Sequence, residues 1–240
     1  MSARGRRQPA RPGPAAPLSE AASPELAPPQ ARNGRCRLVL TGGPGAGKTT
    51  AADLFRRELG ERVVVVPEAA SMLFAGGFPR TGDRLAIEAV QRAIYHVQRN
   101  LEDVQSARFP GRILLCDRGT VDGAAYWPGA PEAFFRALGT SLEQELARYD
   151  ACIFFETAAA GGLRIDGGNR FRIESAEQAL ELDRRLREIW SQHERFVLVP
   201  HNPSFFKKIT FGLAAIESIV AQLEAGSPGA DSAAGGRRSG

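Results

Sequence analysis

The stretch LVLTGGPGAGKTT, residues 38–50, decides the fold of this chain. It contains the Walker A pattern GxxxxGK[ST] between a buried apolar run and a helical segment, which is the context in which this pattern binds phosphate. The glycines let the backbone curl so that successive N–H groups face phosphate oxygens, and the following helix N-terminus adds partial positive charge. The strand, the lysine and the threonine together disfavour the alternative of a chance glycine-rich turn.

Each position of this loop has an expected role. Lys48, on a loop expected to face solvent, should reach the β- and γ-phosphates of a nucleoside triphosphate, and Thr49 should ligate Mg²⁺. The loop thus predicts a nucleoside triphosphate and Mg²⁺ as the cofactors. The residues expected to bind the nucleotide are Gly42, Gly43, Pro44, Gly45, Ala46, Gly47, Lys48, Thr49 and Thr50.

Length and composition favour one folded domain with different ends. The chain has 240 residues, of which 43% are hydrophobic, enough for a sizeable core. Residues 1–33 are dominated by Ala, Pro, Arg and Gly, and residues 226–240 by Gly, Ser and Ala. Neither end has a periodic apolar face that could offset the entropy of ordering. We expect two disordered tails and a folded domain over residues 34–225.

Charge and cysteine content indicate which partners and which compartment to expect. The net charge of +4 lies partly in arginines of the tails, which fit solubilising ends better than a nucleic-acid or lipid contact. The N-terminal prolines also disfavour a transit peptide. No apolar run approaches a membrane span. Cys36, Cys116 and Cys152 are far apart and odd in number, which predicts reduced thiols in a cytoplasmic protein.

Five apolar runs alternate with helical patterns. The helical segments include residues 47–60, an apolar stripe from Val90 to Val104, a capping box at Ser141 with Gln144, and a last helix over Phe206–Leu223. This alternation predicts an α/β fold, a P-loop NTPase with a five-stranded, mainly parallel sheet sandwiched by helices. The predicted strands are Cys36–Thr41, Val63–Val66, Arg112–Cys116, Ala151–Phe155 and Phe196–Val199.

Polar residues follow the strands at the edge where such sheets bind ligands. Asp117 is expected to hold Mg²⁺, with an N-cap as the alternative, and Arg118 to neutralise phosphate charge. Glu68 could accept a proton from an acceptor hydroxyl, or could form a surface ion pair instead.

A basic, glycine-hinged segment follows the fourth run. Over Arg164–Arg172 we expect a lid, with Arg170 and Arg172 as catalytic residues that stabilise the transferring group, and a solvated loop as the alternative. His201 is a further candidate for the nucleotide site, and Trp127 and Trp190 are expected to pack. Weak candidates for an acceptor pocket are Phe78, Arg80, Gln91, Arg92, Tyr95, Asp122 and Tyr126.

Four segments together resemble a known family. GGPGAGKTT, VVPEAA, CDRGTVDGAAYW and NRFRIESAEQA…LDRRLREIW are similar to the AAA-type, NadR-like ATP-binding domain family, which is related to nicotinamide riboside kinase and, more distantly, to deoxynucleoside and thymidylate kinases. The likeness covers about residues 35–215. It implies a nucleoside-kinase-like core in which Glu68 takes the base position, Asp117 and Arg118 form the acid–arginine pair, and Asp122 lies near the base-reading acid. Gly119 departs from the Ser or Tyr frequent there.

These features predict a Mg²⁺-dependent kinase that moves the γ-phosphoryl group of ATP to a small acceptor of the nucleoside or nucleotide type. The alternative is an ATP- or GTP-binding regulatory NTPase that acts through protein or lipid partners. No Asn-Lys-x-Asp string for guanine is present, which favours ATP. The sequence leaves the acceptor and the oligomeric state open.

Overall fold

The computed structural model describes residues 36–161 and 176–225. The two predicted tails, at residues 1–33 and 226–240, lie outside the described residues. So does the predicted lid with Arg164, Arg170 and Arg172.

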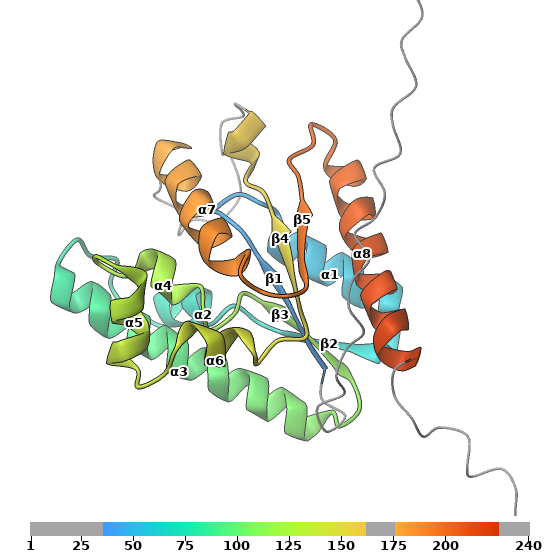
Figure 1. Cartoon of the computed structure of the whole chain (residues 1–240), viewed down its shortest axis with the longest axis horizontal. Helices are drawn as coiled ribbons and strands as arrows, with labels where there is room; N and C mark the ends of the chain where they lie inside the picture. Colours follow the sequence, from blue (N-terminus) through green and yellow to red (C-terminus); the bar gives the residue numbers. More distant parts are fainter. Residues whose placement is uncertain (1–35, 162–175, 226–240) are drawn as a thin grey trace, which may run out of the picture.

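A five-stranded parallel sheet organises the chain, in the order β2-β3-β1-β4-β5 (Figure 1). Four strands have the predicted bounds: β1 (Cys36–Thr41), β2 (Val63–Val66), β4 (Ala151–Phe155) and β5 (Phe196–Val199). The third, β3 (Ile113–Asp117), begins and ends one residue later than expected. It extends to Asp117, which pairs with Leu40 on β1.

The helices and 3₁₀ turns alternate with the strands as the apolar periodicity predicts. Gly60, with φ of +59°, ends the first helix, and Ser141 and Gln144 form the predicted capping box. The helices are α1 (Lys48–Leu59), α2 (Ala69–Ala75), α3 (Arg84–Arg108), α4 (Gly123–Tyr126), α5 (Pro131–Ala137), α6 (Leu142–Leu146), α7 (Ala176–Trp190) and α8 (Phe205–Ala225), with 3₁₀ turns η1 (Gly60–Arg62) and η2 (Ala158–Gly161).

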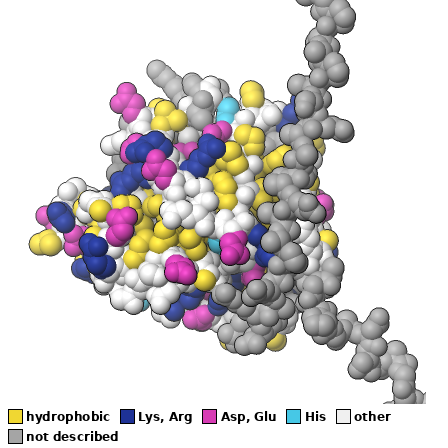
Figure 2. All heavy atoms as spheres, in the orientation of Figure 1, with side chains coloured by type: hydrophobic (Ala, Val, Ile, Leu, Met, Phe, Trp, Pro, Cys, Tyr) yellow, Lys and Arg dark blue, Asp and Glu magenta, His cyan; other side chains and the backbone are white. Residues whose placement is uncertain are grey.

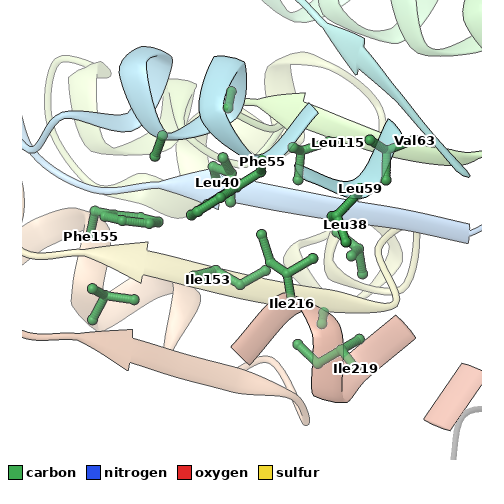
Figure 3. Packing of buried hydrophobic residues seen from close by; sticks show 14 of the residues in the cluster. Leu38, Leu40, Phe55, Leu59, Val63, Leu115, Ile153, Phe155, Ile216 and Ile219 are labelled. Atoms are coloured by element: carbon green, nitrogen blue, oxygen red, sulfur yellow. The ribbon is translucent and has the colours of Figure 1, made fainter. Parts of the chain in front are cut away.

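One face of the sheet is covered by α1 and α8. Phe55 of α1 lies against Phe155 of β4, with ring centroids 6.3 Å apart, and Ile216 of α8 packs into the same cluster (Figure 3). All three side chains are fully buried. This packing holds the N-terminus of α1 at the carboxyl end of β1.

The opposite face is covered by α3, the short helices α4 to α6, and α7 (Figure 1). Its core is aromatic, with Phe134, Phe154 and Trp190 fully buried. The sheet is therefore sandwiched between two helical layers, which confirms the predicted architecture.

On the outside, acidic and basic side chains are scattered together over the face seen in Figure 2. Among the described residues, no helix is long and apolar enough to cross a bilayer.

The buried face of α3 differs from the predicted apolar stripe. Val90 is buried, but Val104 is 51% exposed, and the inward positions instead include Gln98 and Glu102. The reason is a buried polar network between α3 and the α6–β4 region. Glu102, with no exposed surface, accepts hydrogen bonds from Arg148 Nη2 and Tyr149 Oη, both at 2.7 Å.

Removal of Arg148 should destabilise the fold strongly. In Arg148→Met, Glu102 would keep its charge in the interior without its closest cation, a change that typically costs about 3–5 kcal/mol. In urea unfolding, the midpoint urea concentration should fall strongly, while the dependence of the unfolding free energy on urea concentration should stay unchanged. The matched control is Arg184→Met, because Arg184 also pairs with two glutamates, Glu181 and Glu188, but on the surface. Equal midpoints for the two variants would contradict a structural role for the buried pair.

Candidate functional site

The phosphate loop joins β1 to α1, and two of its glycines are required by geometry. Gly42 has φ of +134°, and a Cβ there would lie 2.0 Å from the carbonyl oxygen of Phe155. Gly47 has φ of +85°, and a Cβ would lie 2.6 Å from the ring of Phe205. Side chains at these positions would meet both backbone strain and a close neighbour, so the loop keeps its curl only with glycine.

The carbonyl groups of the loop are held from inside the protein. Each contact joins a side chain to a loop carbonyl oxygen: Lys48 Nζ to Gly42 (2.9 Å) and Gly43 (3.0 Å), Thr157 Oγ1 to Pro44 (2.6 Å), and Lys208 Nζ to Ala46 (2.9 Å). The N-cap of α1 is Gly47, which has no side chain that could cap the helix. The first N–H groups of α1 therefore have no partner within the helix and are suited to bind phosphate oxygens.

Lys48 is buried, not solvent-facing as the sequence led us to expect. It is 5% exposed, because its ammonium group turns back under the loop. Burial, followed by the nearby Arg118 guanidinium, lowers the pKa of Lys48 to about 7, although Asp117 and Glu68 oppose the shift. A phosphate group in the adjoining cavity would favour the charged form of this lysine.

Thr49 and Asp117 form the part of the site suited to Mg²⁺. Thr49 Oγ1 donates to Asp117 Oδ2 at 2.6 Å, while Asp117 Oδ1 is buried and has no hydrogen-bond partner within residues 36–161 and 176–225. Burial and the neighbouring Glu68 raise the pKa of Asp117. Asp117 ends β3 and does not cap a helix. Among the described residues, no group of three or more His, Cys, Asp or Glu side chains could hold a metal ion. Thr49 and Asp117 offer oxygen ligands of the kind that Mg²⁺ takes, and phosphate and water would supply the others.

Glu68, at the end of β2, is paired with Arg118. Arg118 Nε donates to one carboxylate oxygen of Glu68, and Ser71 Oγ donates to the other. Burial opposes ionisation, but Arg118 and Ser71 outweigh it and lower the pKa of Glu68 to about 2. Glu68 is thus a carboxylate at neutral pH, able to accept a hydrogen bond but weakly basic. The pair faces the cavity and is not the surface ion pair considered above.

Arg118 reaches this position through an unusual backbone. Its φ of +78° lies in the left-handed region, which costs a non-glycine residue about 1–3 kcal/mol. Two bonds hold it there: its N–H donates to Leu40 O at 2.9 Å, and its carbonyl accepts from Gln98 Nε2 at 3.2 Å. The guanidinium then also donates to Asp122 Oδ2 at 2.9 Å.

Asp122 is anchored from the sheet and from α7. It accepts from Thr41 Oγ1 at 3.0 Å and from Trp190 Nε1 at 2.7 Å, and it is 5% exposed. Trp190, expected only to pack, therefore also fixes a polar group of the site. Asp122 in turn orients Arg118.

The weak acceptor-pocket candidates separate into two groups. Arg80, Gln91, Asp122 and Tyr126 line one cavity with the phosphate loop, Glu68, Asp117 and Arg118. The other three lie elsewhere: Tyr95 donates to the buried Glu145, Arg92 lies over the ring of Trp127, and Phe78 is 39% exposed. His201 is not among the cavity-lining residues either; its N–H donates to Glu156.

The cavity has a volume of about 1520 Å³. That exceeds the roughly 300–1,000 Å³ usual for one small ligand, so there is room for two. One end is the phosphate loop. The other, between α2 and α3, is walled by apolar side chains beside the Glu68–Arg118–Asp122 cluster, among them Met72, Phe74, Ile87, Val90 and Ile94.

Three solved structures share the fold. A NadR protein in complex with NAD and AMP-PNP aligns over 78% of this chain and 50% of its own, at 12% identity and a TM-score of 0.54. Deoxyadenosine kinase from M. mycoides with bound dATP aligns over 76% and 99%, at 12% identity and 0.52. Thymidylate kinase from Candida albicans aligns over 78% and 93%, at 15% identity and 0.55. This chain thus spans half the length of the NadR protein.

No curated protein sequence matches the chain. A family model described as an AAA domain matches residues 37–205, from the first strand through the phosphate loop to the start of α8. With this match and the P-loop kinase fold of its structural neighbours, the chain belongs to the AAA domain family.

Proposed function

We propose that this protein is a Mg²⁺-dependent kinase that transfers the γ-phosphoryl group of ATP to a small acceptor of the nucleoside or nucleotide type. One observation carries the proposal: a single cavity holds a phosphate loop at one end and a polar cluster with apolar walls at the other. A protein that only hydrolysed nucleotide would need no second compartment.

At the donor end, the chain supplies charge and fixed dipoles. The N–H groups at the start of α1 bind phosphate oxygens, and Lys48 lies directly beneath the loop. Mg²⁺ bound by Thr49 and Asp117 would neutralise the developing charge on the phosphates. Arg170 and Arg172, outside the described residues, keep their predicted role as lid residues that stabilise the transferring group.

At the acceptor end, Glu68 accepts a hydrogen bond from the acceptor hydroxyl and orients its oxygen toward the γ-phosphate. Arg118 is shared between the carboxylates of Glu68 and Asp122. The charge of Arg118 is therefore already balanced, which favours an uncharged acceptor hydroxyl at this point of the cavity. Gln91, with an amide that can both donate and accept, and the apolar walls suit a flat heterocycle.

The ligands named in the related structures agree with this proposal, since AMP-PNP and dATP are adenine nucleotides. Cys36, Cys116 and Cys152 are free thiols, of which Cys116 and Cys152 are buried. Reduced thiols fit a reducing compartment, and we place the activity in the cytoplasm on that basis.

A panel of acceptors tests the function directly. The protein is incubated with ATP, Mg²⁺ and either nucleosides or their matching 5′-monophosphates, and new phosphorylated products are identified by mass spectrometry. A phosphorylated nucleoside or nucleoside monophosphate would support the proposal, and phosphorylation of the nucleosides alone would support the uncharged acceptor. Steady ATP hydrolysis with no phosphorylated acceptor would replace it with the regulatory NTPase.

Loss of the loop lysine should remove nucleotide binding. In Lys48→Ala, the charge beneath the phosphates and two contacts to loop carbonyls disappear together, so ATP affinity should fall more than about 10-fold, the equivalent of one charge-assisted contact. Isothermal calorimetry with ATP and Mg²⁺ measures this. The control is Lys207→Ala. Lys207 is exposed and precedes Lys208, the other lysine that binds the loop, and its variant should bind ATP as the wild type does. Unchanged affinity in Lys48→Ala would refute a phosphate-binding role for the loop.

Replacement of Glu68 should slow transfer without weakening ATP binding. Glu68→Gln keeps the shape but loses the charge that orients the acceptor and Arg118, and we expect a decrease of about 10²-fold in the rate, the size of a lost orientation effect. Because the pKa of Glu68 is lowered to about 2, its carboxylate stays ionised as pH falls to about 4. The rate should therefore show no titration of Glu68 between pH 5 and 9. Glu61→Gln, at an exposed position, is the control. An inflection near pH 6 that disappears in Glu68→Gln would instead identify a strong base.

A further inference from the structure

Asp183 of α7 lies far from the phosphate loop in sequence but contacts it in the structure. Its Oδ1 accepts two backbone hydrogen bonds, from Gly43 N at 2.8 Å and from Thr157 N at 2.9 Å. The residue is 6% exposed. One oxygen atom therefore joins a helix, the phosphate loop and the segment that follows β4.

A second bond completes this linkage. Thr157 Oγ1 donates to the carbonyl oxygen of Pro44 at 2.6 Å. Asp183 thus holds the N–H of Gly43 directly and, through Thr157, the carbonyl of the next residue. Pro44 has no N–H group, so Gly43 and Pro44 together have three polar backbone groups. Asp183 binds the Gly43 N–H, and Thr157 binds the Pro44 carbonyl. The Gly43 carbonyl is bound by Lys48.

The absence of a side chain at Gly43 matches this contact. A Cβ at residue 43 would lie 2.6 Å from Asp183 Oδ1 and 2.8 Å from Asp183 Cβ. Unlike Gly42 and Gly47, Gly43 does not have a positive φ. Glycine is therefore needed here for the approach of Asp183, and the backbone conformation alone would accept alanine.

Opposing effects act on the pKa of Asp183. Burial raises its pKa, while the N–H groups of Gly43 and Thr157 and the charge of Lys48 oppose that shift, and Glu156 adds to it. Burial in turn lowers the pKa of Lys208 to about 8, against the opposing charges of Asp183 and Glu156. Asp183 thus lies near Lys48 and Lys208, the two lysines that bind carbonyl groups of the loop.

We propose that Asp183 is a positioning residue for the phosphate loop, which fixes the first half of the loop so that the amides of its second half meet the phosphates. This inference rests on ATP binding at the loop, as in the proposed function. It also couples the loop to α7, because α7 forms part of the cavity wall through Glu177, Gln178, Glu181 and Leu182.

Two substitutions of Asp183 distinguish its hydrogen bonds to the loop from its charge. Asp183→Ala leaves the N–H groups of Gly43 and Thr157 without a partner and releases the loop. The affinity for AMP-PNP with Mg²⁺, measured by calorimetry, should fall about 10- to 100-fold, the equivalent of one or two charge-assisted hydrogen bonds. Asp183→Asn keeps an oxygen that can accept both bonds, so it should bind within about 3-fold of the wild type.

A structural control keeps this test specific. Glu102→Ala removes a fully buried carboxylate in the α3 network, away from the phosphate loop, and should lower stability while leaving AMP-PNP affinity unchanged. All variants are compared at a temperature where circular dichroism shows each one folded. Equal affinity of Asp183→Ala and wild type would overturn the proposal. So would tighter binding in both Asp183 variants, since that result would assign Asp183 an electrostatic effect alone.

A second variant tests the same contact from the loop side. Gly43→Ala should displace the Asp183 carboxylate and weaken AMP-PNP binding to a similar extent. Because both changes break one contact, the double variant should bind about as weakly as the weaker single variant. Losses that simply add would show that Gly43 and Asp183 act independently and would reject the linkage. Failure of the wild-type protein to bind AMP-PNP would instead reject the proposed function.

Discussion

The inward orientation of the phosphate-loop carbonyls is the constraint on which the site depends. A tight loop can present its N–H groups to a ligand only if its carbonyl oxygens find donors elsewhere. Here the donors come from the first turn of α1, from the end of β4 and from α8, through Lys48, Thr157 and Lys208. Because these elements lie on neighbouring parts of the sheet, the strand order and the packing of α8 are conditions for phosphate binding as well as for stability.

A second constraint orders the acceptor side. Arg118 adopts a strained backbone, and the loop after β3 is held by groups that never reach the cavity. Thr120 donates through its N–H to Tyr149 Oη at 2.7 Å and through its hydroxyl to Glu145 at 2.8 Å. Such strain persists only when the surroundings over-determine it. The polar network between α3 and α6 therefore supports the acceptor side of the site, and α3 contributes buried glutamine and glutamate to it where an apolar stripe was expected.

The sequence predicts those parts of the molecule that local patterns determine. Four strand bounds were predicted correctly because buried parallel strands are short apolar runs, and the rule that ligands lie at their carboxyl ends brought Glu68, Asp117 and Arg118 together. Contacts between distant segments had no such signal. Asp183 looks like one more polar residue of a charged helix, and Trp190 like a core residue, until the fold places them beside Gly43 and Asp122. The burial of Lys48 was missed for a different reason: its partners are backbone carbonyls of its own loop, and a backbone carbonyl leaves no signal in residue type.

The electrostatics of the cavity explain why these parts must act together. Burial lowers the pKa of Lys48 and raises that of Asp117, so each group is less stable in its charged form than it would be in water. A triphosphate favours the charged lysine, and a divalent cation favours the charged aspartate. Either ligand alone would improve one of the two groups and oppose the other, because the phosphates repel Asp117 and the cation repels Lys48. Under the proposed function, the nucleotide and the metal would therefore bind best together, which is the form in which a kinase uses its phosphate donor.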